Sequence, residues 1–283
     1  MRSRAGFLAG VLVVVGLLGG VTAGSVTAAT STTVTWKVSS LTAGQVKNLS
    51  DVATSNSPGV KTWSKSGSCT LSPTSNPTTL TMGSTGSCTL TLQIAKTNKY
   101  SAKTSTQTIL VLTCATGGAC ALGQKGPGGG TVFYVDKTRP AGSRYFEAAC
   151  AGWSDGKCGG NNLADPRAEW GCYGTYLWGA NGTAIGTGEQ NTTDIAIGCE
   201  QKRIAAKIAR DLVLGGQKDW FLPSKNELER MYNQKRIIGH FSSVYYWSSS
   251  ENGDAAWAEY FNYGLQGDFY KDYAFYIRPI RSF

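Results

Sequence analysis

Apolar and polar positions alternate through the first part of the chain, from about residue 30 to residue 113. Short segments such as TVTWKV, TLTM, CTLTLQI and QTILVL place an apolar side chain at every second position, and Ser, Gly, Asn and Pro separate them. This two-residue period is typical of strands that bury one face. Runs with helical spacing do not occur in this region. The pattern therefore predicts a small all-β sandwich over residues 30–113.

A glycine-rich stretch follows this region. Residues 114–130 read CATGGACALGQKGPGGG. Glycine and proline interrupt regular structure and favour turns. We expect a linker here, and a disulfide between Cys114 and Cys120 would close part of it into a small loop.

The spacing of apolar residues changes again between residues 131 and 283. TVFYVD and RYFEAA indicate strands, because they are rich in β-branched and aromatic residues. The segment between Cys150 and Cys199 is rich in Gly, Asn and Trp and has little periodicity. A segment of that length without regular structure is uncommon unless it is functional or cross-linked.

Two helices are expected after this segment. In CEQKRIAAKIARDLVLGG (199–216), Ile204, Ile208 and Leu212 recur every four residues, and two glycines end the pattern. The second helix is expected to begin at Ser224, which forms a capping box with Glu227.

Strand patterns return after Gly239, in SVYYWSS, AAWAEYFNYG and YAFYIRPIRSF. An order of strands, two helices and then several strands predicts an α+β domain over residues 131–283. We expect TVFYVD and FYIRPIRSF to pair with each other. Trp220, Trp247 and Trp257 are assigned to its core.

The N-terminus has the features of a secretory signal. Arg2 and Arg4 precede an apolar run from Phe7 to Val21, and small residues follow. The run is shorter than the roughly 20 residues of a membrane-spanning helix. We therefore predict a signal peptide over residues 1–29, with an uncleaved anchor as the alternative. The mature chain is expected to be secreted or associated with the cell surface, without a transmembrane segment.

The cysteine count supports an oxidising compartment. An even number of cysteines in a secreted chain indicates disulfides, whereas zinc sites need closer Cys or His partners, and the chain has one histidine. Cys150 and Cys158 are close enough for a local loop, and Cys172 and Cys199 flank the central segment, although six cysteines allow 15 connectivities. The eight residues predicted to form disulfides are Cys69, Cys88, Cys114, Cys120, Cys150, Cys158, Cys172 and Cys199.

The net charge of +9 is unevenly distributed. Residues 1–113 carry nine Lys and Arg against one acidic residue, whereas residues 114–283 carry 18 against 17. The C-terminal region is therefore nearly neutral. Binding of nucleic acid through overall charge is not expected.

Several motifs resemble known bacterial families. SGSCTL, TGSCTLTL and NKYSAKTSTQTI resemble the bacterial Ig-like repeats of surface and secreted proteins. That resemblance implies a Cys69–Cys88 disulfide and a role as a spacer.

The C-terminal region contains five ordered motifs: GPGGGTVFYVD (126–136), GTGEQNT (186–192), GGQKDWFLPSKNELERMY (215–232), YWSSSE (246–251) and RPIRSF (278–283). In these motifs it resembles domains grouped with the C-terminal domain of the Legionella collagen-like protein (the DUF1566 type) and, more distantly, the Fibrobacter major paralogous domain. The resemblance implies a C-type-lectin-like fold, in which the first and last strands pair and two helices flank a small antiparallel sheet, and a role in adhesion.

Catalysis has two candidate constellations in the sequence. A Ser or Cys nucleophile would need His240, which has no nucleophile-elbow motif nearby. Glu251, Asp254 and Glu259 lie close together in sequence and form the alternative function, an acid/base set for a cell-wall or polysaccharide hydrolase. The leading prediction is a non-enzymatic binding protein without a cofactor. Calcium stays open, although Asp155, Asp165, Glu251, Asn252 and Asp254 match no known calcium-loop spacing.

The leading prediction for the ligand site is the tyrosine-rich segment YGLQGDFYKDY, which we expect to be a turn between two strands. Tyrosines offer a large contact area with a polar tip, which suits a glycan or protein ligand. The alternative is that these rings pack the sheet. The predicted ligand-binding residues are Tyr263, Gln266, Asp268, Tyr270, Lys271 and Tyr273.

Overall fold

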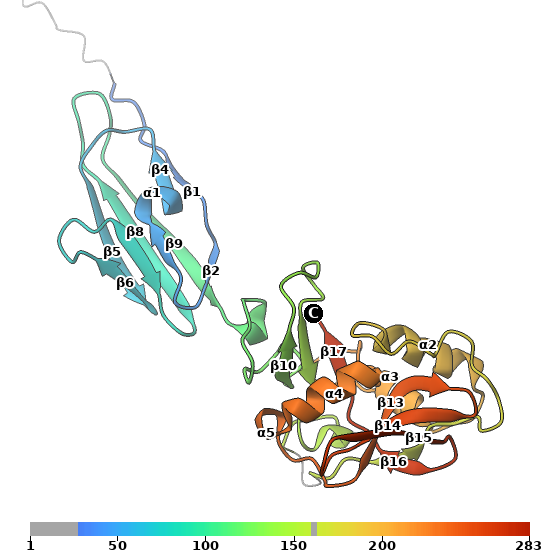
Figure 1. Ribbon diagram of the computed structural model, residues 1–283. Coiled ribbons are helices and arrows are strands. Elements are labelled where there is room, and N and C mark those ends of the chain that lie inside the picture. The colour runs from blue at the N-terminus through green and yellow to red at the C-terminus, as the bar shows by residue number, and fades with distance from the viewer. Residues whose placement is uncertain (1–27, 160–162) are drawn as a thin grey trace, which may run out of the picture.

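The computed structural model of the chain describes residues 28–159 and 163–283 (Figure 1). Strands β1–β9 form one group of sheets and β10–β17 another, with the short 3-10 helix η1 (Cys114–Thr116) between them. The predicted signal peptide lies almost entirely outside the described residues. Within those residues no helix is long and apolar enough to cross a membrane.

The N-terminal group is all-β apart from one four-residue helix. In β8 the side chains at Cys88, Leu90, Leu92 and Ile94 are buried, which is the alternation that the sequence predicts. Its elements are β1 (Val34–Trp36), β2 (Ser40–Thr42), β3 (Val46–Asn48), α1 (Leu49–Val52), β4 (Ala53–Ser55), β5 (Lys61–Gly67), β6 (Cys69–Ser72), β7 (Thr79–Met82), β8 (Ser87–Ile94) and β9 (Lys103–Leu112).

Two sheets of this group enclose an apolar core. Their strand orders are β2-β9-β8-β5 and β3-β7-β6, while β1 pairs with β4. Side chains from both sheets meet in one cluster that includes Leu41, Leu80, Leu90 and Ile109. A disulfide from Cys69 on β6 to Cys88 on β8 joins the two sheets.

The glycine-rich stretch is packed more closely against the following domain than a free linker would be. Cys114 and Cys120 form the expected disulfide. The N–H of Gly128 donates a hydrogen bond to Glu147 Oε1 at 2.8 Å. A Cβ atom at Gly128 would lie 2.5 Å from the ring of Trp220, so only glycine fits there. The end of the predicted linker is therefore part of the domain's packing.

The C-terminal group is mixed α+β, as the sequence predicts. Its elements are β10 (Thr131–Val135), β11 (Tyr145–Ala148), η2 (Trp153–Asp155), β12 (Arg167–Glu169), α2 (Gly188–Gly198), α3 (Ala205–Arg210), α4 (Lys225–Asn233), α5 (Lys235–Ile238), β13 (Tyr245–Asn252), β14 (Ala255–Tyr260), β15 (Leu265–Tyr270), β16 (Ala274–Tyr276) and β17 (Ile280–Ser282).

The pairing of the first and last strands differs from the prediction. β11 lies between β10 and β17, and it pairs with both in antiparallel register. The direct β10–β17 pairing that the sequence suggested is therefore wrong. The two ends of the domain still lie close together, because β10 and β11 form a hairpin whose second strand carries β17 (Figure 1).

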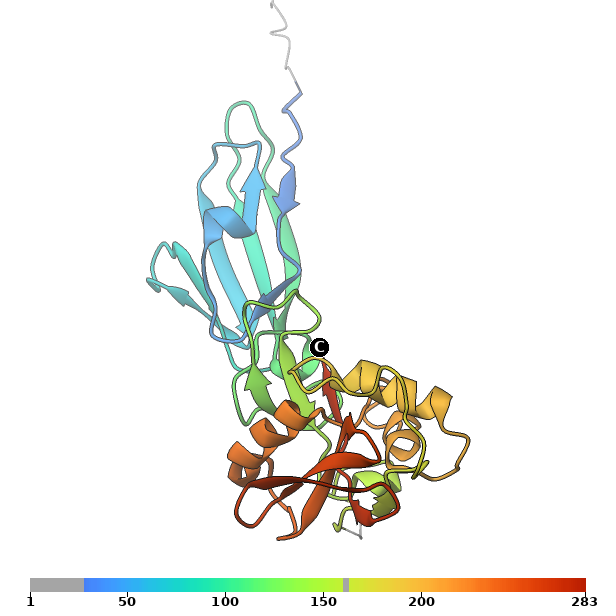
Figure 2. The same cartoon turned by 45° about the vertical axis from the view of Figure 1, so that its right-hand side comes forward.

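The helices also differ in part. The capping box of α4 is present: the Ser224 side chain accepts from the N–H of Glu227, and Glu227 accepts from the N–H of Ser224. The helix expected over 199–216 is only the six-residue α3. The longer helix α2 lies in the segment that we expected to be irregular. In both views α2 lies on the opposite side of this lobe from α4 and α5 (Figure 2).

The second sheet of this group supports the candidate site. Its strand order is β12-β16-β13-β14-β15, so β15 is an edge strand. One face of the sheet contributes Trp247, Ala256 and Ala258 to a core that also contains Trp170. Tyr246 and Phe261 pack instead with Leu228 and Met231 of α4. All four disulfides pair as predicted, with Cys150–Cys158 and Cys172–Cys199 bracing the central segment.

Candidate functional site

The sheet formed by β13, β14 and β15 presents aromatic rings on the face opposite α4. Strands β13 and β14 place Tyr245 opposite Tyr260, and β14 and β15 place Ala256 opposite Phe269. Tyr245, Tyr260, Phe269 and Phe275 are each only partly buried. Part of this sheet face is therefore in contact with solvent, although it consists of rings.

The rings contact one another in a continuous series. Tyr263 contacts Tyr260 at 5.8 Å between ring centroids, and Tyr260 contacts Tyr245 at 4.9 Å. Tyr245 contacts both Phe269 and Phe275, at 4.6 and 5.2 Å. These separations are those of favourable aromatic pairs, which hold one another in place.

The series continues beyond Phe275 to the domain's central segment. Phe275 stacks on Tyr273 with an interplanar angle of 17°, and Tyr273 lies 6.5 Å from Tyr270. Tyr270 makes an edge contact with Tyr173 at 5.4 Å. We call the whole series the aromatic strip; its members are Tyr173, Tyr245, Tyr260, Tyr263, Phe269, Tyr270, Tyr273 and Phe275.

The tyrosines at the ends of the aromatic strip are the most exposed. Tyr263 is 71% exposed, Tyr270 55%, Tyr173 53% and Tyr273 49%. The three predicted ligand-binding tyrosines, Tyr263, Tyr270 and Tyr273, belong to one series of contacting rings. That series runs along the sheet and is not confined to a turn, because Leu265–Tyr270 forms strand β15.

Lys271 lies elsewhere, although it was expected in the ligand site. Its side chain is fully buried, with Nζ 2.5 Å from Glu251 Oε1 and 5.0 Å from the centre of the Trp170 ring. Nζ also donates to the carbonyl of Thr175 at 2.8 Å. A buried, fully engaged ammonium does not reach a ligand at the surface. Lys271 is a positioning residue for the loop that carries Tyr173.

That loop, residues 172–178, is fixed from three sides. Cys172 is bonded to Cys199. The N–H of Leu177 donates to Glu251 Oε1 at 2.8 Å, and Lys271 holds Thr175. The loop is therefore held in place without regular secondary structure.

Gln266 and Asp268 lie on the same side of β15 as Tyr270, because side chains alternate along a strand, whereas Phe269 points to the other side. Gln266 donates to the carbonyl of Lys225 at 3.0 Å, and Asp268 accepts from Asn252 at 2.8 Å. Asp268 is exposed and Gln266 is half-buried. Both stay candidate ligand residues beside Tyr270, although they lie on a strand and not in the expected turn.

The sequence reasoning also missed two exposed rings of the loop. Tyr176 and Trp178 form an edge-to-face pair at 5.0 Å, and Trp178 is 85% exposed. Their only signal was the high Trp and Tyr content of an aperiodic segment. Among the tryptophans assigned to the core, Trp220 and Trp247 are buried. Trp257 is half-buried beneath Lys225, whose Nζ lies 3.4 Å from the ring centre.

The three carboxylates of the hydrolase hypothesis do not come together. Glu251 is opposite Ala256, and Glu259 is three residues farther along β14, about 10 Å at the rise of a strand. Glu251 faces Leu177 and Lys271, whereas Glu259 faces the opposite side, where Gln266 donates to it at 3.2 Å. Asp254 is exposed in the turn between the strands. A glycosidase needs two carboxyl groups that face one bond, and this set does not provide them.

Two buried carboxyl groups, Glu259 and Glu227, have raised pKa values. Burial raises the pKa of Glu259 to about 7, and its Oε1 has no hydrogen-bond partner among the described residues. Burial also raises the pKa of Glu227 to about 7, although the N–H groups of Ser224 and Gly186 donate to it. Glu227 is held by the start of α4, so its role is to order that turn.

Metal ligands do not gather in the described parts of the chain. Over residues 28–159 and 163–283, no three His, Cys, Asp or Glu side chains form a group that could hold an ion. Among the calcium candidates, Asp165 forms a buried ion pair with Arg278 and Glu251 one with Lys271.

Comparison with known proteins assigns no family. No protein-family model matches the chain, and no curated protein sequence matches it significantly. The resemblances drawn from short motifs therefore stay predictions.

Proposed function

We propose that this chain is an exported, non-catalytic binding protein whose C-terminal domain recognises a carbohydrate through the aromatic strip. The observation that carries the proposal is the continuous ring series from Tyr263 to Tyr173 on a partly exposed sheet face. Sugar rings have apolar faces, which pack on aromatic side chains, while tyrosine hydroxyls remain free to hydrogen-bond the sugar's edge.

The charges near the aromatic strip favour an uncharged glycan. The exposed polar side chains next to Tyr270 and Tyr273 include Asp268 and Asp272. These carboxylates would repel a sulfated or carboxylated polymer. The excess positive charge of the chain lies in residues 1–113, away from this sequence region. We therefore propose a neutral glycan as the ligand.

The rigidity of the surface supports the same function. The loop that carries Tyr173 is fixed by a disulfide and a buried ion pair. The ring contacts within the strip hold Tyr245, Phe269 and Phe275 against one another. A preformed surface loses little conformational entropy when it binds, so weak stacking contacts contribute more to affinity.

The C-type-lectin-like fold and the Ig-like spacer belong to the same proposal. The motif resemblances, the β11–β17 pairing next to the domain's entry, and helices on both sides of the lobe support a lectin-like domain. The two packed sheets with a Cys69–Cys88 disulfide support an Ig-like spacer. Four disulfides are typical of proteins that fold outside the reducing cytosol.

A glycan array with the purified protein tests the function. We expect saturable binding to neutral glycans, loss of binding in Tyr270→Ala, and retention of most binding in Tyr270→Phe, which keeps the ring. Release of reducing sugar from the bound glycan would instead favour the alternative, a polysaccharide hydrolase. If no glycan binds and the immobilised protein instead captures a protein partner, the ligand is a protein and the carbohydrate proposal is wrong.

A further inference from the structure

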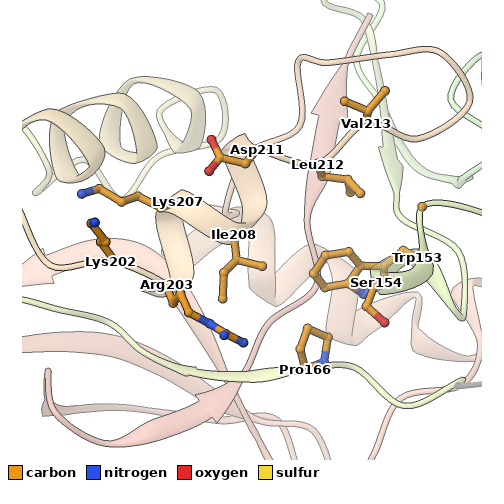
Figure 3. Close-up of a pocket in the computed structure, with 11 residues that line it drawn as sticks. Trp153, Ser154, Pro166, Lys202, Arg203, Lys207, Ile208, Asp211, Leu212 and Val213 are labelled. Carbon is orange, nitrogen blue, oxygen red and sulfur yellow. The ribbon is translucent and has the colours of Figure 1, made fainter.

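A second concave site lies away from the residues of the aromatic strip. It has a volume of about 660 Å³ and is formed by η2, the start of β12, and α3 with its flanking residues (Figure 3). Cavities of roughly 300–1,000 Å³ are the usual size for small-molecule sites. We call it the α3 pocket. Its lining is Trp153, Ser154, Gly156, Pro166, Lys202, Arg203, Lys207, Ile208, Asp211, Leu212 and Val213.

The α3 pocket has an apolar centre. Figure 3 shows Ile208 in the middle of the space, with the ring of Trp153 on one side and Pro166 below. Trp153 is itself fixed, because its Nε1–H donates to Asp165 at 2.7 Å, and Asp165 is paired with Arg278. The floor can therefore accept an apolar group of about the size of one or two rings without rearranging.

The rim of the α3 pocket is cationic. Its lining includes three cationic side chains, Lys202, Arg203 and Lys207, and one carboxylate, Asp211. In the parts of the chain that the structure describes, neither Lys202 nor Arg203 forms an ion pair, and both are exposed. Lys207 already donates to the carbonyls of Cys199 and Gln201, at 2.6 and 3.0 Å. Lys202 and Arg203 can therefore interact with an anionic group at the edge of the apolar centre.

The backbone holds Arg203 in an uncommon conformation. Its φ is 58°, in the left-handed region that costs a non-glycine residue free energy. In Figure 3 the guanidinium of Arg203 extends along the pocket toward Pro166, whereas the amino groups of Lys202 and Lys207 are drawn on the side away from Pro166. Arg203, the residue with the strained backbone, is therefore the one whose guanidinium lies beside the apolar centre.

Disulfides brace both walls. The short helix η2, which carries Trp153, lies within the loop closed by Cys150 and Cys158. Lys202 and Arg203 follow Cys199, which is bonded to Cys172. Such bracing keeps the apolar floor and the cations in a fixed relation, as a preformed ligand site requires.

We propose that the α3 pocket binds a small amphipathic anion, an aromatic or branched apolar body that carries one carboxylate, sulfonate or phosphate group. The apolar body would pack on Ile208, Leu212 and Trp153. The acidic group would accept hydrogen bonds from Arg203, and Lys202 would add positive charge at the rim. This site is separate from the proposed glycan surface and does not depend on it.

Two dyes that differ by one sulfonate group test the proposal on the full-length protein. Anilinonaphthalene sulfonate carries an aromatic body and a sulfonate, and N-phenyl-1-naphthylamine is its neutral counterpart. We expect the sulfonate to bind at one saturable site and the neutral dye to bind more weakly. Arg203→Gln should lower the affinity for the sulfonate dye about tenfold, because a charge-assisted contact is lost, and should leave the affinity for the neutral dye unchanged.

Matched variants locate the dye. Arg236→Gln removes an exposed arginine of α5 and should change nothing, and Arg203→Lys should restore part of the sulfonate affinity. Ile208→Ala should weaken both dyes. The proposal is overturned if the two dyes bind equally well, or if Arg203→Gln and Arg236→Gln behave alike. Loss of sulfonate binding in Tyr270→Ala would place the dye on the aromatic strip and would also overturn it.

Discussion

The Nζ of Lys271 lies 2.5 Å from Oε1 of Glu251, and both side chains are completely buried. This ion pair connects the chain after β15 to the end of β13. The same carboxylate oxygen accepts the N–H of Leu177, and the ammonium reaches the carbonyl of Thr175. One buried pair therefore positions the loop that completes the aromatic strip.

Removing one partner of this pair should be costly. Lys271→Met leaves the Glu251 carboxylate buried without its counter-ion, so we expect a loss of about 3–5 kcal/mol in the free energy of unfolding, measured with urea. The double variant Lys271→Met/Glu251→Leu removes both charges and should recover part of that loss. A double variant no more stable than the single one would contradict this role of the pair.

A ring and a carboxylate on the same side of β15 should respond differently to truncation. Tyr270→Ala removes an exposed ring of the aromatic strip and should weaken glycan binding about tenfold, with little change in the melting temperature. Asp268→Ala removes the exposed carboxylate of a neighbouring residue and should change the affinity much less. Calorimetric titration and thermal unfolding check both variants. Equal losses of affinity would show that the aromatic ring does not dominate binding.

Stability should fall between about pH 5 and pH 8. The carboxyl of Glu259 has a pKa of about 7 in the folded protein and about 4.5 when unfolded, so the folded state holds the proton more tightly. Its stabilising contribution is complete below about pH 4.5 and is lost as the pH rises through 7, and the shift corresponds to about 3 kcal/mol. Glu227 has a shift of the same direction.

The variant Glu259→Gln distinguishes the contribution of Glu259 to this pH dependence from that of Glu227. The amide cannot ionise, so the decline in unfolding free energy between pH 5 and pH 8 should become shallower, and Glu227 should supply the remaining slope. Urea unfolding at several pH values measures this. A slope that is unchanged in Glu259→Gln would contradict the assignment.

The Cys172–Cys199 disulfide should stabilise the domain and order the tyrosine loop. It closes a loop with a sequence separation of 27 residues. Replacement of both cysteines by alanine should lower the free energy of unfolding by about 3.5 kcal/mol on the chain-entropy account. Glycan affinity should fall as well, because Tyr173 is next to Cys172. Unaltered stability and affinity would show that the ion pair alone fixes the loop.

The sequence predicted best where the local signal was strong. The capping box of Ser224 and Glu227 marks the start of α4. Alternation along CTLTLQI identified β8, and the even cysteine count predicted that all eight cysteines form disulfides.

The wrong predictions concern segments in which polar or small residues are buried or form the secondary structure. The buried side of α2 consists of Gly188, Asn191, Thr192, Ile195 and Ala196, so it has no apolar stripe to reveal a helix. The segment around Leu265–Tyr270 looked like a turn because of Gly264 and Gly267, although Leu265–Tyr270 forms strand β15. Lys271 looked like a surface cation because its partner, Glu251, is 20 residues away in sequence.

The most direct test of the account is to measure glycan binding by the native protein and by Tyr270→Ala over a range of salt concentrations. If the aromatic strip recognises a neutral glycan by stacking, affinity should hardly change between low and high salt, and Tyr270→Ala should lose about tenfold. Binding that is abolished by salt, or that Tyr270→Ala leaves intact, would contradict the central claim.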